Sequence, residues 1–381
     1  MSTGNHEVRI GFTGDISFTG VFRERVLNEY EITRYIDTKI IECLAKNDWN
    51  VGNIEGPITL VNTPNSAGVA LKSPPEVAKV LRRLKINCYN LANNHIMDYG
   101  VLGLRDTLDF AYQNDAVPMG AGVDISYASR PVVFEKYDIK LGLLSISHNE
   151  GMLATDKKPG VFAERSDELI LERIRWLRSC CDWVIINYHG GEEYTFVPSP
   201  LRRHRLLRYL NYGADIIIAH HPHVVQGYEQ VGNKRIFYSL GNFIFDIPEH
   251  SGCKGTDQSV IISLIFKKKS FEVVTLYTKS NLSIGRVGAV SMSLYYSELL
   301  HDVYLHKWEQ EAFRIISDQF RSTDYVYRSL LAQMFSTYMV LMVRRALGVM
   351  RRLKNPIFRN MILSACKYQL ANLFRRSFFI L

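Results

Sequence analysis

Five groups of polar side chains follow short apolar runs of the sequence, and their chemical types could bind a metal ion. Each run is typical of a buried strand that ends at glycine or polar residues. These strands are expected at Val8–Phe12, Asn50–Ile54, Cys88–Leu91, Trp183–Asn187 and Ile216–Ala219. Carboxylates, carboxamides and imidazoles are ligands suited to zinc, manganese, iron or nickel. Since ligand groups in α/β folds gather at the carboxyl ends of strands, we expect the five groups to converge.

The polar residues of these groups are closely spaced along the chain. They are Asp15 after the first strand, Asn53 and Glu55 at the second, Asn93, Asn94, His95 and Asp98 after the third, His189, Glu192 and Glu193 after the fourth, and His220, His221 and His223 after the fifth. Taken singly, the acids could lie in solvated turns, the asparagines could form turns, and His189 could form a surface ion pair. The histidine run beside Pro222 has no obvious packing role. Together the five groups favour a metal site.

Helices and hairpins are expected in the intervals between these strands. Helical periodicity covers residues 22–47, 75–85, 101–115, 165–180 and 199–212. Hairpins are expected at 132–146, 224–240 and 258–278. Strands that alternate with helices and are followed by hairpins predict an α/β domain with a mixed sheet.

The composition is that of an ordinary globular protein. The chain has 381 residues, of which 47% are hydrophobic and 22% charged, enough for one large domain with an appendage or for two domains. Its six cysteines show no C-x-x-C spacing, so free thiols in a reducing compartment are expected. The first residues lack the pattern of a signal peptide, and no apolar run reaches the length of about 18 residues that a spanning helix requires. We therefore predict a cytoplasmic protein.

The net charge of +8 is concentrated near the C-terminus, where only helices are expected from about residue 297 onward. Residues 325–381 contain ten Lys or Arg and no Asp or Glu. Arginine pairs beside Leu, Met and Phe fit amphipathic helices on an anionic membrane surface at the inner face of the membrane. Helices that pack their apolar side on the α/β domain fit equally well. Nucleic-acid binding is not expected, because no recognised binding motif accompanies the charge.

Six segments within roughly residues 8–246 resemble, in order, the motifs of the CapA family of capsule biosynthesis, which includes poly-γ-glutamate capsule synthesis proteins. They are "GFTGDISFTG", "NIEGPIT", "LANNHIMDYG", "YHGGEEY", "GADIIIAHHPHVVQGYE" and "IFYSLGNFIFD". The resemblance implies a fold similar to the calcineurin-like metallophosphoesterases, a four-layer β-sandwich flanked by helices. This domain would span residues 8–280, and the basic helical region 297–381 is not covered.

The resemblance also implies roles for the polar residues. The metal ligands would be Asp15, Glu55, Asn94, His189, His221 and His223. Glu55 would bridge two cations, with His221 beside Asn94 and His189 at one ion, and His223 beside Asp15 at the other. The cofactor would be one or two divalent ions of manganese, zinc or iron. His95 would be the proton donor, with Asp98 orienting its imidazole.

Two departures from the phosphoesterase pattern fall at the first two motifs. Ser17 stands where that pattern has a histidine ligand, and Glu55 follows Asn53 where it has Gly-Asp. Both are shared with the CapA pattern, and they suggest a weakened first metal site. Substrate-binding or outer-shell roles are expected for Asn53, Glu193, His220 and Asn242.

Two functions from different classes remain open at the level of sequence. One is a metal-dependent hydrolase acting on a phosphorylated or amide substrate. The other is a non-catalytic accessory protein that binds an anionic polymer or stabilises capsule synthase components. The ligand set favours the first as chemistry, and fold similarity alone cannot decide between them.

Overall fold

The computed structural model describes most of the chain up to residue 311. The described residues are 6–28, 32–65, 68–148, 152–165, 167–291, 298–299, 304, 307–308 and 310–311. Contacts divide the chain into two units, Met1–Ile315 and Ile316–Leu381, and all described residues belong to the first. The predicted basic helices lie almost entirely outside the described residues. The five described cysteines, Cys43, Cys88, Cys180, Cys181 and Cys253, are free thiols.

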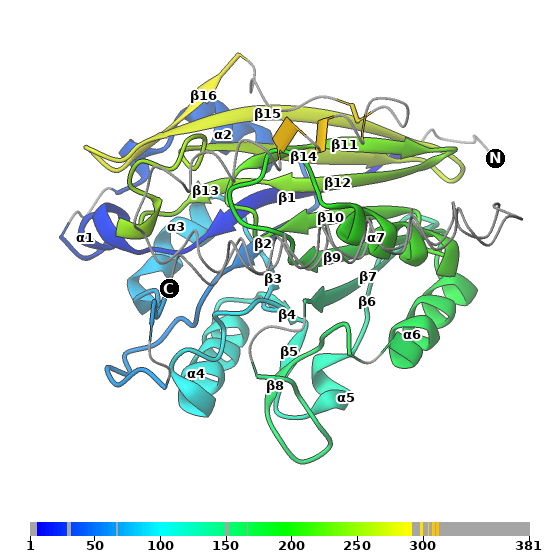
Figure 1. Ribbon diagram of the computed structural model, residues 1–381, viewed down its shortest axis with the longest axis horizontal. Helices are drawn as coiled ribbons and strands as arrows, with labels where there is room; N and C mark the ends of the chain where they lie inside the picture. The colour runs from blue at the N-terminus through cyan, green and yellow to red at the C-terminus, as the bar shows by residue number, and fades with distance from the viewer. Residues whose placement is uncertain are drawn as a thin grey trace, which may run out of the picture. The chain divides into compact units, whose positions relative to one another are not determined.

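The first sheet combines parallel and antiparallel strands (Figure 1). Its order is β16 (Arg286–Val290), β15 (Phe271–Asn281), β14 (Gln258–Phe266), β1 (Val8–Ile16), β2 (Trp49–Ile54), β3 (Cys88–Asn90) and β4 (Val117–Met119), with β13 (Asn242–Ile244) beside the end of β1. Strands β1 to β4 run parallel, whereas β14, β15 and β16 are antiparallel neighbours. The predicted mixed sheet is thus confirmed.

The second sheet has a parallel centre between two antiparallel edges. Its order is β11 (Val225–Val231), β12 (Lys234–Leu240), β10 (Ile216–His220), β9 (Trp183–His189), β7 (Ile139–Ser147) and β6 (Val132–Lys136). The predicted hairpins form β6–β7, β11–β12 and β14–β15. A small third sheet joins β5 (Ala121–Gly122) to β8 (Gly160–Val161).

Helices connect the parallel strands and cover the outer faces of the sheets. They are α1 (Gly20–Asn28), η1 (Ile32–Tyr35), α2 (Thr38–Ala45), η2 (Pro75–Val77), α3 (Ala78–Arg83), α4 (Gly100–Gln113), α5 (Ile125–Ala128), α6 (Asp167–Cys180), α7 (Pro200–Tyr212) and η3 (Pro248–His250). The range 22–47, where helical periodicity was predicted, contains α1, η1 and α2 rather than a single helix. Asp37 begins a new helix there, because its side chain accepts a hydrogen bond from the backbone N–H of Lys39.

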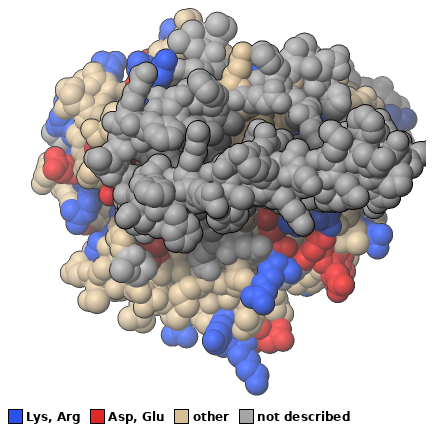
Figure 2. Space-filling model, in the orientation of Figure 1, with Lys and Arg blue, Asp and Glu red and all other residues tan. Residues whose placement is uncertain are grey.

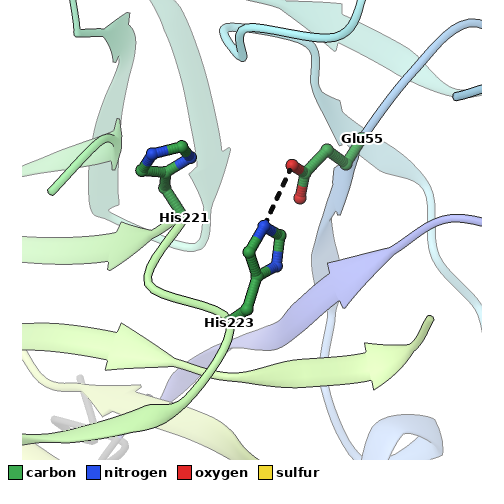
Figure 3. Close-up of side chains that lie close together, drawn as sticks. All are labelled: Glu55, His221 and His223. Atoms are coloured by element: carbon green, nitrogen blue, oxygen red, sulfur yellow. Dashed lines mark ion pairs between the residues drawn. The ribbon is translucent and has the colours of Figure 1, made fainter. Parts of the chain in front are cut away.

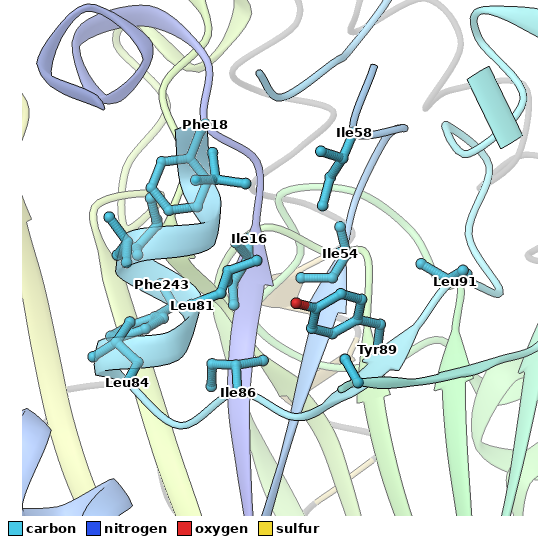
Figure 4. Packing of buried hydrophobic residues seen from close by; sticks show 14 of the residues in the cluster. Ile16, Phe18, Ile54, Ile58, Leu81, Leu84, Ile86, Tyr89, Leu91 and Phe243 are labelled. Carbon is cyan, nitrogen blue, oxygen red and sulfur yellow. The ribbon is translucent and has the colours of Figure 1, made fainter. Parts of the chain in front are cut away.

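Three apolar clusters give the molecule its layers. Between the sheets, Phe12 and Val51 from the first pack with Leu143 and Ile218 from the second. A second cluster joins the other face of the first sheet to α1–α4 (Figure 4), and a third joins the second sheet to α6 and α7. Each fully buried leucine, isoleucine or phenylalanine side chain contributes about 1.5–3 kcal/mol. The four-layer sandwich flanked by helices is therefore confirmed.

Strand register brings the polar strand ends together. Asp15 pairs with Asn53 across β1–β2 and with Asn242 across β1–β13. In the second sheet, His189 pairs with His220 across β9–β10. Within each sheet these strands are parallel neighbours, and His220 Nδ1 of the second sheet lies 3.0 Å from Asp15 Oδ1 of the first, so the carboxyl ends of both sheets meet on one side of the sandwich.

Surface charge on the described unit has both signs. Figure 2 shows Lys and Arg side chains interspersed with Asp and Glu on the visible described surface. Within the described ranges, no helix combines the length and the apolar character needed to cross a bilayer.

Candidate metal centre

Five of the predicted ligands form two overlapping groups at the strand ends. One group is Glu55 with His221 and His223, and the other is Asp15 with Glu55 and His189. In each group the potential ligand atoms lie within 4.8 Å of one another. Figure 3 shows Glu55 facing the two histidines, with its Oε1 3.8 Å from His223 Nε2. Because Glu55 belongs to both groups, its carboxylate is placed to bridge two sites.

The sixth predicted ligand, Asn94, joins the centre through His189. Its Oδ1 lies 2.8 Å from His189 Nε2, and that nitrogen is 3.8 Å from Glu55 Oε1. On the opposite side, His223 Nδ1 is 3.6 Å from Asp15 Oδ2. The rings of His189 and His221 are 5.0 Å apart. The contacts of Asn94 with His189 and of Asp15 with His223 agree with the expected division of ligands, whereas the two groups join His221 with His223 and His189 with Asp15. The division between two ions stays a prediction.

The centre contains buried oxygens that no described residue satisfies. Glu55 is fully buried, and neither carboxylate oxygen has a hydrogen-bond partner among the described residues. The same holds for Asp15 Oδ2 and for the Oγ of buried Ser17. An unpaired buried carboxylate costs several kcal/mol, so such groups normally coordinate a metal or bind a counter-charge. The donor set of carboxylates and imidazoles therefore fits a divalent cation.

Burial also sets the protonation of these groups. The pKa of Glu55 is raised well above its ordinary value by burial and, secondarily, by the negative charges of Asp15 and Glu193. The pKa values of His189 and His221 are lowered well below the ordinary value, chiefly by burial and then by neighbouring histidines. A neutral imidazole is the form that binds metal, so the two histidine shifts favour ligation, whereas the raised pKa of Glu55 means that this carboxyl must lose a proton when a cation binds.

Asn53 and Asn90 form a chain of hydrogen bonds that ends on the predicted ligands Asp15 and His189. The backbone N–H of Ala92 donates to Asn90 Oδ1 (3.3 Å), which leaves Asn90 Nδ2 to donate to Asn53 Oδ1 (2.8 Å). Asn53 Nδ2 must then donate to Asp15 Oδ1 (2.9 Å) and to His189 Nδ1 (3.1 Å). Asn53 thus contacts two of the predicted ligands, and its outer-shell role stays a prediction.

His95 and Asp98 form a separate pair at the more open side of the centre. His95 Nδ1 lies 2.7 Å from Asp98 Oδ2, which also accepts the backbone N–H of Leu71 at 2.8 Å. The His95 side chain is 18% exposed, whereas those of His221 and His223 are 4% exposed. With Nδ1 engaged by Asp98, the Nε2 of His95 is left for a proton transfer, as the predicted role requires.

The remaining predicted residues occupy three different positions. His220 Nδ1 is 3.0 Å from Asp15 Oδ1, so His220 supports a ligand. Glu193 Oε1 is 4.0 Å from His221 Nε2, and its side chain is 33% exposed. Asn242 Oδ1 is 3.0 Å from His223 Nδ1. Glu192 does not face the ligands, because it accepts the hydroxyl of Ser199 at 2.6 Å.

The histidine run after β10 has an uncommon backbone. His221 has φ +98° and His223 has φ +57°, on either side of Pro222. Side chains other than glycine rarely adopt these values, and each such residue costs on the order of 1–3 kcal/mol. Such a cost persists where surrounding structure enforces it, and this geometry turns both imidazoles toward Glu55.

The whole centre falls within one family match. The family described as "Bacterial capsule synthesis protein PGA_cap" matches residues 9–247, which include every predicted site residue. The chain belongs to this family.

Two capsule-synthesis family members illustrate the relationship. The PGA biosynthesis protein CapA of Bacillus subtilis (strain 168) is 33% identical over 278 residues, or 70% of each chain. The capsule biosynthesis protein CapA of Bacillus anthracis is 31% identical over 251 residues, or 64% of this chain and 61% of the relative. A hypothetical protein from Thermus thermophilus superimposes with a TM-score of 0.44 at 13% identity, covering 72% of this chain and all of the other.

Two residues beside the metal centre are not among the predicted site residues. Asn90 was counted with an apolar strand, although its place as the last residue of β3 put it in register with Asn53. His250 lies in η3, and its Nδ1 is 3.2 Å from Asn242 Nδ2. Strand order could have indicated Asn90, whereas no local pattern marks His250, which reaches the centre only through the fold.

Proposed function

We propose that this chain is a metal-dependent hydrolase of capsule or poly-γ-glutamate-type polymer biosynthesis, acting on a phosphoester or an amide bond. One observation carries the proposal: Glu55 is fully buried between three histidines, and neither of its oxygens has a partner among the described residues. A purely structural site would satisfy such a carboxylate with an arginine, a lysine or backbone N–H groups. The names of the family members supply the biological setting.

The residues that would hold the cofactor are those of the two groups and Asn94. They are Asp15, Glu55, Asn94, His189, His221 and His223. One or two ions of manganese, zinc or iron suit these oxygen and nitrogen donors. When bound, a divalent cation lowers the pKa of a bound water and polarises a phosphoryl or carbonyl oxygen.

The protein's own contribution to bond cleavage would come from His95. Its Nδ1 lies 2.7 Å from Asp98 Oδ2, and this contact orients the ring. Nε2 would then deliver a proton to the oxygen or nitrogen that leaves. Such proton transfer typically contributes about 10²–10⁴-fold to the rate.

A non-catalytic role as a polymer-binding or synthase accessory protein is the second candidate. It is favoured by Ser17, whose hydroxyl stands where the phosphoesterase pattern has a histidine. One imidazole ligand is thereby lost, and an anionic polymer could bind a single cation without being cleaved. Under this proposal, His95→Ala would have no effect on function beyond the effects that loss of the metal also causes.

Two measurements, of bound metal and of hydrolytic activity, distinguish the hydrolase from the accessory protein. The purified full chain would be analysed for bound metal and assayed with Mn²⁺ on phosphodiester, phosphomonoester and γ-glutamyl amide substrates. We expect one or two ions per chain and turnover that His95→Ala reduces by about 10²–10⁴-fold while metal stays bound. His204→Ala is the matched control, because His204 is exposed on α7.

Metal without turnover on any substrate would favour the accessory role. Absence of metal after reconstitution with Mn²⁺, Zn²⁺ and Fe²⁺ would contradict both the hydrolase and the metal centre.

A further inference from the structure

His223 is held by a chain of hydrogen bonds whose direction can be deduced. Asn242 Nδ2 lies 3.1 Å from the backbone oxygen of Thr256, which can only accept a hydrogen bond. The amide oxygen of Asn242 must therefore face the other way, toward His223 Nδ1 at 3.0 Å. Since that oxygen can only accept, His223 Nδ1 carries a proton.

This proton fixes the chemistry of the opposite nitrogen. When the ring is neutral it has only this one proton, so His223 Nε2 then carries a lone pair, and it lies 3.8 Å from Glu55 Oε1. The ring is thus prepared to bind a cation through Nε2 before any cation arrives. A ligand held in the correct tautomer binds metal more tightly, because no proton must be moved.

His250 forms the far end of the chain. Its Nδ1 is 3.2 Å from Asn242 Nδ2 and accepts the second amide N–H of Asn242. The His250 ring is 5% exposed, stacks on Phe245 with ring centroids 5.2 Å apart and lies 4.6 Å from the His223 ring. Both N–H groups of the Asn242 amide are then occupied, so the amide cannot rotate without breaking two hydrogen bonds.

His189 is held in the opposite way. Its Nδ1 accepts from Asn53 at 3.1 Å, so its Nε2 carries the proton and points to Asn94 Oδ1 at 2.8 Å. A cation that binds this Nε2 must displace the proton, and binding there releases it to solvent. The two histidines of one centre are therefore prepared differently, and the difference comes from the two asparagines behind them.

We propose that His250 is a positioning residue which, together with the Thr256 carbonyl, holds the Asn242 amide and thereby fixes His223 in the tautomer that binds metal through Nε2. The inference rests on the proposed metal centre and adds a residue that lies outside it. His250 would not touch substrate. Its effect would be on the affinity of the His223 side of the centre and only indirectly on turnover.

The tautomers can be read directly in the metal-free protein. We would record two-bond ¹H–¹⁵N correlation spectra of the histidine rings at a pH of about 8.5, where ordinary imidazoles are neutral. His223→Gln and His189→Gln assign the signals. We expect His223 protonated on Nδ1 and His189 protonated on Nε2, so each ring controls for the other. We call the hydrogen-bonded residues His250, Asn242 and His223 the relay. A His223 ring that is protonated on Nε2 in the wild-type protein would by itself overturn the proposal.

Two variants then test the relay itself by Mn²⁺ titration calorimetry. Asn242→Leu removes the acceptor and should weaken Mn²⁺ binding by about 10–100-fold, the usual effect of losing an outer-shell partner. His250→Phe keeps the ring stacking but removes the second restraint. It should weaken binding less and give a mixture of His223 tautomers. His204→Phe, the same change at an exposed position, should alter neither.

The outcomes separate this proposal from the proposed function. A His250→Phe variant that loses affinity with an unchanged His223 tautomer would show a packing effect and overturn the relay. A wild-type chain that binds no Mn²⁺ would contradict the metal centre, while the histidine spectrum would still decide the tautomer. Thermal unfolding shows whether each variant folds. If a variant does not fold, the histidine spectrum of the wild-type protein still shows which tautomer His223 adopts.

Discussion

Two buried polar clusters lie beside each other at the ends of β9 and β10, and they are satisfied in opposite ways. In the first, the Arg202 network, Glu164 accepts from Arg202 Nη1 at 2.8 Å and from the Tyr188 hydroxyl at 2.6 Å. In the second, the metal centre, Glu55 and Asp15 are equally buried, yet three of their four oxygens have no partner among the described residues. The Arg202 network contains its own counter-charge, whereas no arginine or lysine pairs with Glu55 or Asp15 among the described residues.

The difference shows how burial can be interpreted. The carboxylates of the two clusters are similarly buried, so burial alone does not identify a functional site. The distinguishing property is the balance of donors and acceptors within each cluster. A balanced cluster stabilises the fold, whereas an unbalanced one costs stability until a ligand supplies the missing partner.

The largest difference should appear on removing the central carboxylate of the metal centre. Glu55→Gln takes away the one ligand common to both groups, so Mn²⁺ affinity should fall by more than the roughly 100-fold expected for an outer-shell change. The metal-free variant should be no less stable than wild type, because a buried carboxylate without partners is replaced by a neutral amide. Titration calorimetry and denaturant unfolding measure the two effects. If Glu55→Gln kept its Mn²⁺ affinity, Glu55 would not be a metal ligand and the two clusters would not differ in this respect.

The equivalent change in the Arg202 network should have the opposite profile. Glu164→Gln leaves the buried guanidinium of Arg202 without its carboxylate, which should cost about 3–5 kcal/mol of unfolding free energy. Mn²⁺ affinity should stay close to that of wild type, provided the protein is kept below its lowered unfolding temperature. Denaturant unfolding checks the first value. A loss below about 1 kcal/mol would mean that the network is not a structural element.

Adding the cation should stabilise the wild-type chain by an intermediate amount. At a free Mn²⁺ concentration 100 times the dissociation constant, the unfolding free energy should rise by about 2.7 kcal/mol, and a chelator should reverse it. Glu164→Gln should show the same increment, and Glu55→Gln should show little or none. Thermal unfolding with and without Mn²⁺ measures this. Equal stabilisation of all three proteins would indicate binding elsewhere.

The smallest difference should come from two serines, one in each cluster. Ser17 Oγ is buried without a partner among the described residues, so Ser17→Ala should change unfolding free energy by less than about 0.5 kcal/mol. Ser199 donates to Glu192 and caps α7 by accepting from Arg202 N at 3.2 Å. Ser199→Ala should therefore cost about 1–2 kcal/mol. Equal losses in denaturant unfolding would contradict the proposed imbalance.

Much of the fold was predictable because it follows from local pattern. The runs ending at Asp15, Glu55 and His189 are apolar and bounded by polar residues, and each became a strand. The turn segments predicted the three hairpins. Helical periodicity at 22–47 indicated helices but did not locate their bounds, because caps such as Asp37 decide where a helix begins.

The sequence alone determined which chemical groups are available and that they follow strands. It therefore indicated a metal site, and the order of its motifs indicated a family. These properties are encoded locally, in the alternation of apolar and polar residues and in the short motifs.

Only the tertiary structure decided how those groups are paired. Asp15 meets Asn242 because β13 pairs with β1, although the two strands are far apart in the chain. His250 reaches Asn242 only because η3 folds back onto the centre, and the tautomer of His223 depends on the direction of that one amide. Hydrogen-bond direction is a property of at least three groups in space, so no spacing along the chain can specify it.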